Sequence, residues 1–289
     1  MSALVPDQLK DMWTAVEAGR ISYEDFGLEQ DRLLGKYRSR WVKALLLENH
    51  TDLQDSILAE ISLYTGCADL EEIRQRCKLG AEAVAYDWKR IQPDNDKSIA
   101  EFYNKSVSYI YDLMWWHTLA DDNSPLAYVT ALEFAERNQC RYHLDFGAGV
   151  GSGNILFLRC GFESAAADIS SSLIQFGRWR FKVRNLPLPT FIDLKEMSLP
   201  AAYFDIITAM DVFEHLTDPV RAVDHLSNAL KPGGFLFGRF APDAEEHDHP
   251  QHIVHDFSPT LERMRALGFV HVWQDEWLWG HQVFQKPQA

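Results

Sequence analysis

The sequence has few cysteines, no apolar run of membrane length and no basic leader. The four cysteines form neither a C-x-x-C pair nor a regular framework, which predicts reduced thiols: Cys67, Cys77, Cys140 and Cys160. No stretch approaches the roughly 18 continuous apolar residues of a membrane span. The segment "MSALVPDQLKDMW" lacks the features of a signal peptide. These absences predict a cytoplasmic protein without a membrane partner.

Positive charge is also scarce. The chain has 28 Lys and Arg against 42 Asp and Glu, a net charge of −14 and a pI near 5.2. Such a chain has no broad positive field, which excludes general nucleic-acid binding. The local basic segment "RWRFKVR" at 178–184 is typical of a solvated helix face. Hydrophobic residues, by contrast, make up 46% of the chain and include nine tryptophans, which predicts a packed globular protein.

The first part of the chain has helical periodicity. Apolar residues of 23–50 recur at three- and four-residue steps, and 68–80 repeats the pattern and stops at Gly80, a residue typical of helix ends. A break at 92–98 precedes a third predicted helix over 99–120, and 126–138 predicts a short fourth one. We expect residues 1–122 to form an all-helical cap or lid domain, through which the protein could form oligomers.

From residue 123 to 289 the pattern changes to alternating strands and helices, which predicts a mainly parallel sheet covered on both faces. Helices are expected to begin at Gly151, Ser170, Val212 and Ser258. Seven strands are expected, over 141–146, 164–169, 189–193, 204–210, 234–240, 269–275 and 278–285. Little sequence separates the last two, so they should form an antiparallel pair. The expected fold class is α/β: a doubly wound seven-stranded sheet with an antiparallel edge strand, plus the N-terminal helical domain.

The stretch "HLDFGAGVGSG" places a glycine at every second position after an apolar strand. Glycine buries no side chain, so this spacing indicates a ligand that the backbone approaches closely, although close packing alone would also use it. The dinucleotide fingerprint G-x-G-x-x-G is absent, so the ligand need not contain a pyrophosphate. Asp145 at the strand tip would face a cation. Asp168, at the tip of the next strand, is placed to accept both hydroxyls of a ribose.

These residues resemble the first motif of the class I S-adenosylmethionine-dependent methyltransferases, in their small-molecule branch. "DVFEHLTDP" and "KPGG" are similar to the segments that follow the fourth strand and precede the fifth strand in that family. The resemblance covers about residues 141–286. It implies that Asp145 lies near the methionine amine, that Asp168 holds the ribose, and that an acid after the third strand, Asp193 or Glu196, contacts adenine. The implied cofactor-binding set is completed by Gly147, Ala148, Gly149, Gly151, Ile169, Met210 and Asp211.

Histidines and carboxylates after the fourth strand supply candidates for the chemistry. Asp211, Glu214 and His215 lie at i, i+3 and i+4, so one helical turn could direct all three at one point. With His252 they resemble the ligands of metal-dependent small-RNA 2′-O-methyltransferases and ubiquinone-pathway O-methyltransferases, which implies Mg²⁺, Mn²⁺, Zn²⁺ or Fe²⁺. Alternatively, His215 or His252 acts alone as a general base. In a third interpretation, Glu214 and His215 only cap a helix, and the histidines at 247, 249, 252 and 255 are exposed to solvent or bonded to the backbone.

The aromatic segment "FYNKSVSYIYDLMWWH" at 102–117 lies just before the predicted α/β domain. Aromatic residues at helical spacing usually form ordinary core. Buried Tyr and Trp still need partners for their polar atoms, and related enzymes fold such a segment over the cofactor. We therefore add Tyr109 and His117 to the catalytic candidates.

The predicted function is methyl transfer from S-adenosylmethionine to an oxygen or nitrogen atom of a small or medium-sized acceptor. Two alternatives remain. A non-catalytic S-adenosylmethionine-binding partner or sensor would bind the cofactor without transferring its methyl group. A nicotinamide dehydrogenase would bind NAD(H), but the missing G-x-G-x-x-G disfavours it.

Overall fold

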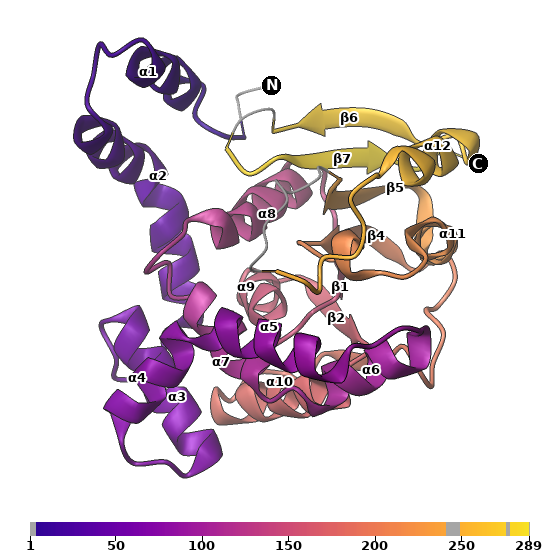
Figure 1. Cartoon of the computed structure of the whole chain (residues 1–289). Helices are drawn as coiled ribbons and strands as arrows, with labels where there is room; N and C mark the ends of the chain where they lie inside the picture. Colours follow the sequence, from indigo (N-terminus) through magenta and orange to yellow (C-terminus); the bar gives the residue numbers. More distant parts are fainter. Residues whose placement is uncertain (1–3, 241–248, 276–277, 289) are drawn as a thin grey trace.

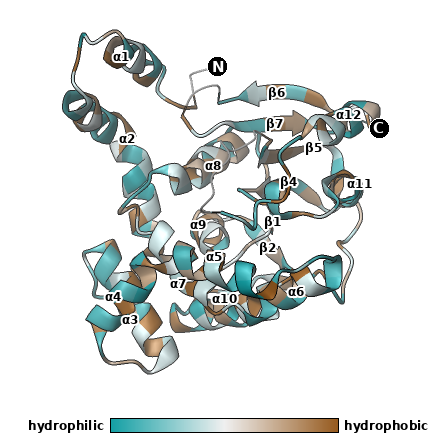
Figure 2. Ribbon diagram, viewed as in Figure 1, coloured by the Kyte–Doolittle hydropathy of each residue, from teal (hydrophilic) through white to brown (hydrophobic). Residues whose placement is uncertain are grey.

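The computed structural model describes residues 4–240, 249–275 and 278–288. The N-terminal part is helical as expected (Figure 1). Its elements are α1 (Gln8–Glu17), α2 (Tyr23–Leu45), α3 (Leu53–Thr65), α4 (Leu70–Lys78), α5 (Gly80–Ile91), α6 (Asp96–Lys105), α7 (Ser108–Trp116), the 3-10 turn η1 (Ser124–Leu126) and α8 (Ala127–Arg137). Figure 2 shows mixed hydrophilic and hydrophobic residues on these helices, as amphipathic helices have.

Side-chain caps fix where several of these helices begin. Ser22, Asp52 and Asp69 each accept a hydrogen bond from a backbone N–H in the first turn of α2, α3 and α4. Asn95 and Ser98 form a reciprocal capping box at the start of α6. These polar residues satisfy backbone donors that have no partner within the helix.

Two sequence-based predictions about this half were wrong. The helix expected over 99–120 is divided into α6 and α7, because Ser106 has an extended backbone between them. Gly80 does not end a helix: Leu79 is the C-cap of α4, and Gly80 is the first residue of α5. A Cβ on Gly80 would lie 2.6 Å from the Cα of Asp112, so glycine is required here for the close approach of α5 to α7.

The second part of the chain forms one seven-stranded sheet in the order β3-β2-β1-β4-β5-β7-β6. Its strands are β1 (Tyr142–Phe146), β2 (Glu163–Asp168), β3 (Thr190–Asp193), β4 (Phe204–Ala209), β5 (Leu230–Arg239), β6 (Val270–Gln274) and β7 (His281–Gln285). The first five strands are parallel, and β7 is antiparallel to both β5 and β6. The predicted fold class is confirmed. The antiparallel strand β7 lies one place in from the edge, which β6 occupies.

Helices cover both faces of the sheet. They are α9 (Ser152–Arg159), α10 (Ser171–Val183), α11 (Pro219–Ala229) and α12 (Ser258–Ala266), with the 3-10 turn η2 (Phe213–His215) in place of the helix expected from Val212. Side chains of α9 and α10 share one core with the N-terminal helices. Side chains of α11 and α12 pack in a second core against the other face. No helix in the described ranges is long and apolar enough to cross a membrane.

A buried ion-pair group joins the helical half to the α/β half. Glu60 of α3 is fully buried and accepts hydrogen bonds from Arg180 of α10 at 3.0 and 3.2 Å. Arg184 donates to the same carboxylate at 2.9 Å and to the carbonyl of Leu45, at the end of α2, at 2.9 Å. Because all three charges are out of water, each depends on the others for compensation.

We predict that Glu60→Ala strongly destabilises the protein. The substitution leaves two buried guanidinium groups without their counter-charge, a change that costs about 3–5 kcal/mol. Urea unfolding followed by tryptophan fluorescence measures the loss. The matched control is Glu101→Ala, which removes an exposed pair with Lys105 and should change the free energy of unfolding by no more than about 0.5 kcal/mol. Equal effects of the two substitutions would contradict the prediction.

Candidate functional site

A cavity of about 820 Å³ lies where the carboxyl ends of β1, β2 and β4 face the helical half. Ligands of doubly wound sheets bind at this edge, where strands turn into helices. The floor is formed by the loop after β1 and by residues that follow β2 and β4. The walls come from α7, from η2, from the segment before α12 and from the connection between β6 and β7. The cavity is therefore built from both halves of the chain.

The loop between β1 and α9 needs its glycines for two different reasons. Gly147, Gly149 and Gly151 have φ values of 74°, 53° and 77°, which side-chain-bearing residues rarely adopt. Gly147 is also confined by space, because a Cβ would lie 2.5 Å from a methyl group of Val212. Gly153 has an ordinary helical backbone, but a Cβ there would overlap the ring of Tyr128. Gly147 and Gly149 line the cavity with their backbone, as predicted for a ligand that approaches closely.

Asp168 holds the glycine loop at the end of β2. Its carboxylate accepts hydrogen bonds from the backbone N–H groups of Gly149 and Ser170, both at 2.8 Å. Burial raises the pKa of Asp168, while these backbone hydrogen bonds act in the opposite direction. The carboxylate also lines the cavity. Since a carboxylate has about four acceptor positions, Asp168 can hold the loop and still accept hydroxyl groups of a ligand.

Asp145 lies behind the loop and is fully buried. One oxygen accepts hydrogen bonds from Thr208 at 2.8 Å and from Tyr128 at 3.2 Å. The other oxygen has no hydrogen-bond partner among the described residues. Burial raises the pKa of Asp145 to about 7. His143, two residues earlier on β1, contacts Thr208 at 2.8 Å and extends this polar network into the sheet.

Sequence reasoning missed His143, Thr208 and Tyr128 as supports of Asp145. The available signal was a polar residue inside each of two apolar strands, "RYHLDF" and "FDIITAM". Buried polar side chains are normally hydrogen-bonded, so His143 and Thr208 could have been paired with each other.

The other predicted cofactor-binding residues divide into two groups. Ala148, Ile169, Met210 and Asp211 line the cavity together with Gly147, Gly149 and Asp168. Gly151 precedes α9 as its N-cap. Asp193 accepts hydrogen bonds from the Ser171 hydroxyl at 2.8 Å and the Lys195 backbone at 3.1 Å, and the neighbouring Leu194 lines the cavity. Their roles toward a cofactor stay predictions.

His117 lies at the end of α7 and also lines the cavity. The Ser152 hydroxyl accepts a hydrogen bond from Arg180 at 2.9 Å and lies 3.0 Å from Nδ1 of His117. If that hydroxyl donates its proton to Nδ1, the ring carries its own proton on Nε2. Burial, with the charge of Arg180, lowers the pKa of His117 to about 3. The ring is therefore suited to donating a hydrogen bond rather than to accepting a proton near neutral pH.

Tyr109 and Tyr103 lie side by side in the cavity wall, with ring centroids 5.3 Å apart. The hydroxyl of Tyr109 is buried and has Tyr103 as its polar neighbour. Burial raises the pKa of Tyr109 well above its usual value. The hydroxyl of Tyr103 contacts Nδ1 of His215 at 3.2 Å, so this aromatic wall reaches the histidines beyond η2.

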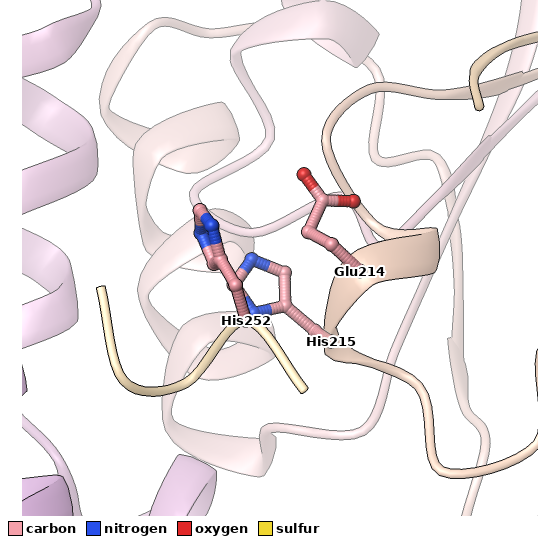
Figure 3. A group of neighbouring side chains, drawn as sticks. All are labelled: Glu214, His215 and His252. Atoms are coloured by element: carbon pink, nitrogen blue, oxygen red, sulfur yellow. The ribbon is translucent and has the colours of Figure 1, made fainter. Parts of the chain in front are cut away.

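Glu214, His215 and His252 are brought together at the cavity (Figure 3). Each offers one ligand atom, and these atoms lie within 4.8 Å of one another. The backbone explains the arrangement, because Ile253 and Val254 both donate to the carbonyl of Glu214, at 2.8 and 3.0 Å. Nδ1 of His215 lies 3.2 Å from the carbonyl of Gln251, which can only accept a hydrogen bond. If Nδ1 donates to this carbonyl, the lone pair of His215 lies on Nε2; if the Tyr103 hydroxyl donates to Nδ1, Nε2 carries the proton.

Asp211, also predicted as a metal ligand, is not part of this group within the described residues. Its carboxylate pairs with Arg239 at 3.3 Å. One carboxylate and two imidazoles suit Zn²⁺, Mn²⁺ or Fe²⁺ better than Mg²⁺, which prefers oxygen ligands. The residues present therefore fit a transition metal. Of the loop histidines, His249 stacks on His252 with centroids 5.0 Å apart, and His247 lies outside the described residues.

Comparisons with known proteins agree with this site. Residues 144–236, from β1 into β5, match the family model of the methyltransferase domain. A ubiquinone biosynthesis O-methyltransferase of Coxiella burnetii is 30% identical over 129 residues, 43% of this chain and 55% of the relative. The same enzyme of Xylella fastidiosa is 33% identical over 96 residues, 32% of this chain and 39% of the relative. This chain thus spans about half the length, or less, of the relatives that it matches.

Among solved structures, the [4+2]-cyclase SpnF is similar at 17% identity and a TM-score of 0.47, covering 58% of this chain and 86% of the other. The family match begins within β1, the strand before the glycine loop, and extends to residue 236. The match thus assigns a methyltransferase domain to residues 144–236, and the glycine loop and strand order support a class I S-adenosylmethionine-dependent methyltransferase.

The raised pKa of Asp145 generates a prediction on stability and pH. The unfolded carboxyl titrates near about 3.9 and the folded one at about 7. Between these pH values the folded protein keeps a proton that the unfolded chain has released. The free energy of unfolding therefore decreases as pH rises through this window, by up to about 1.4 kcal/mol per pH unit.

Asp145→Asn removes the titrating group and keeps an oxygen for Tyr128 and Thr208. Relative to wild type, the variant should gain stability as pH rises from about 4 to about 7, and the difference should stay constant above that. Urea unfolding across this range measures it. A difference that does not change with pH would show that Asp145 is ionised throughout.

Proposed function

We propose that the protein transfers a methyl group from S-adenosylmethionine to an oxygen or nitrogen atom of a small or medium-sized acceptor, in the small-molecule metabolism of the cytoplasm. The observation that carries the proposal is the cavity over the glycine loop, in which Asp168 both holds the loop and faces the ligand space. The O-methyltransferase names of the matching relatives support an oxygen acceptor. Oligomerisation through the helical half stays a prediction.

The chain's own residues have three tasks in this reaction. S-adenosylmethionine, when bound, supplies an already activated methyl group, so the protein chiefly positions the acceptor and excludes water. Asp168 and the glycine loop bind the cofactor at the ends of β1 and β2. Helix α7 covers the loop through Leu113, which lies against Gly149. His215 or His252 accepts the proton of an acceptor hydroxyl. Tyr109 and His117 offer hydrogen-bond donors in the wall.

A metal-assisted form of this function is favoured by the group Glu214, His215 and His252. A divalent transition metal held there would lower the pKa of a coordinated acceptor hydroxyl and orient it. A hydrogen bond from His215 to Gln251 is the kind of second contact that orients metal-binding histidines. His215 and His252 thus have a role in either form of the reaction, whereas Glu214 has one only in the metal-assisted form.

We predict that S-adenosylmethionine and S-adenosylhomocysteine bind the protein in calorimetric titrations, and that NADH does not. Asp168→Ala should weaken binding at least tenfold, because it removes the anchor of the glycine loop and the predicted ribose ligand. The matched control is Glu163→Ala at the opposite end of β2, which should leave the affinity unchanged. Absence of binding by wild type would overturn the proposal. Binding without transfer to any of a panel of phenols, catechols and amines would favour a non-catalytic sensor.

For the metal, we predict that protein purified without chelator contains close to one equivalent of Zn²⁺, Mn²⁺ or Fe²⁺ by elemental analysis. His252→Ala should reduce the content at least tenfold. His271→Ala, on the exposed face of the edge strand β6, is the matched control and should retain the metal. Metal-free protein that still binds S-adenosylmethionine and transfers its methyl group would leave a histidine as the base.

A further inference from the structure

One face of α7 forms a wall of the cavity. Tyr109, Asp112, Leu113 and Trp116 have the i, i+3, i+4 and i+7 spacing of a single helix face, and all four line the cavity. Leu113 points at the glycine loop, since its side chain would lie 2.9 Å from a Cβ on Gly149. Asp112 adjoins the junction of α4 and α5, where Cys77, Lys78 and Ala81 line the same cavity.

Asp112 is a half-buried acid that lines the cavity and makes no hydrogen bond or ion pair among the described residues. Burial, with the nearby charge of Glu82, raises the pKa of Asp112 to about 6, so it is mostly ionised at neutral pH. The backbone at this point is rigid, because α5 packs onto the Cα of Asp112 through Gly80. A carboxylate that lines a cavity and has no cationic partner among the described residues is placed to pair with a cation of a bound ligand.

The surroundings of Asp112 suit an organic cation. The indole N–H groups of Trp115 and Trp116 donate to Asp121 and Asp122, at 2.7 and 3.1 Å. Their hydrogen-bonding edges are thus occupied, and both indoles line the cavity. Aromatic rings beside carboxylates bind ammonium groups through charge and cation–π attraction.

The rest of this wall also suits a cation. The hydroxyl of Tyr109, one turn before Asp112, is buried at the cavity wall with Tyr103 as its polar neighbour. Only Lys78 supplies a basic group to this wall, against the three acids Asp112, Asp121 and Asp122. Its ammonium group lies 6.0 Å from the centre of the Trp115 ring. The wall therefore keeps a net negative charge.

We propose that this face of α7 is the acceptor subsite, and that it binds a protonated amine or quaternary ammonium group of the acceptor with Asp112 as counter-ion and Trp115, Trp116 and Tyr109 around it. The inference rests on the proposed methyl transfer and names its substrate class: an amine-bearing acceptor whose ammonium group anchors it. A neutral or anionic acceptor would leave Asp112 without a partner. The cofactor's own ammonium group is the competing occupant, but Leu113, not Asp112, is the α7 residue over the glycine loop.

The test compares three phenols that differ in charge at the far end: tyramine, 4-ethylphenol and 3-(4-hydroxyphenyl)propionate. Each is titrated calorimetrically into protein saturated with S-adenosylhomocysteine. We expect tyramine to bind at least about tenfold more tightly than the other two. Asp112→Asn should reduce the affinity for tyramine to that for 4-ethylphenol, with the affinity for S-adenosylhomocysteine unchanged, which also shows that the variant is folded. Asp96→Asn removes the same charge from the exposed start of α6 and should change neither affinity.

Two results would overturn the inference. Tyramine that binds no more tightly than 4-ethylphenol would exclude a cation-selective subsite. An Asp112→Asn variant that loses S-adenosylhomocysteine and tyramine together would assign Asp112 to the cofactor. If the wild type binds no S-adenosylhomocysteine, the proposed methyl transfer fails, but titration of the unliganded protein with the same three phenols still decides whether the subsite selects a cation.

Discussion

The buried carboxylate of Glu60 is the contact on which the relation between the two halves depends. Through Arg180 it ties α3 to α10, and Arg180 also donates to the Val150 carbonyl at 2.8 Å and to Ser152. One guanidinium group therefore contacts the helical half, the glycine loop and, through Ser152, the cavity histidine His117. A buried ion pair is often no more stabilising than apolar packing, but it tolerates few alternative arrangements. This contact thus joins the helical half directly to the glycine loop.

The acids in and around the cavity differ in whether other residues of the chain pair with them. Asp168 is satisfied by two backbone N–H groups, and Asp211 by Arg239. Asp145 is removed from the ligand space and depends on Thr208 and Tyr128. Asp112 differs from these three, since no described residue compensates it. A sulfonium cofactor is itself cationic, so an acidic cavity is compatible with it, and Asp112 is the acid that we assign to the proposed acceptor subsite.

Much of the fold and of the cofactor side could be predicted from the sequence. The seven strands have apolar runs, and Gly147, Gly149 and Asp168 lie at strand ends, so their positions follow from local pattern. The division between α6 and α7 could not be predicted, because the helical periodicity continues across Ser106 and tertiary packing decides where the chain turns. Gly80 was misinterpreted for a similar reason: its glycine serves a contact with Asp112, thirty-two residues later in the chain.

The rest of the cavity is less visible in the sequence because several distant segments build it. Its wall combines α7, the α4–α5 junction, the segment around His252 and the β6–β7 connection. None of these segments has a recognisable sequence motif. Tyr109, His117 and His252 could be selected only because their side chains can donate or accept protons and they follow or precede the predicted cofactor site. The structure adds Asp112, which sequence reasoning passed over: it lines the same cavity and pairs with no described residue. If it binds a cation as proposed, recognition depends on an unpaired charge rather than on a sequence motif.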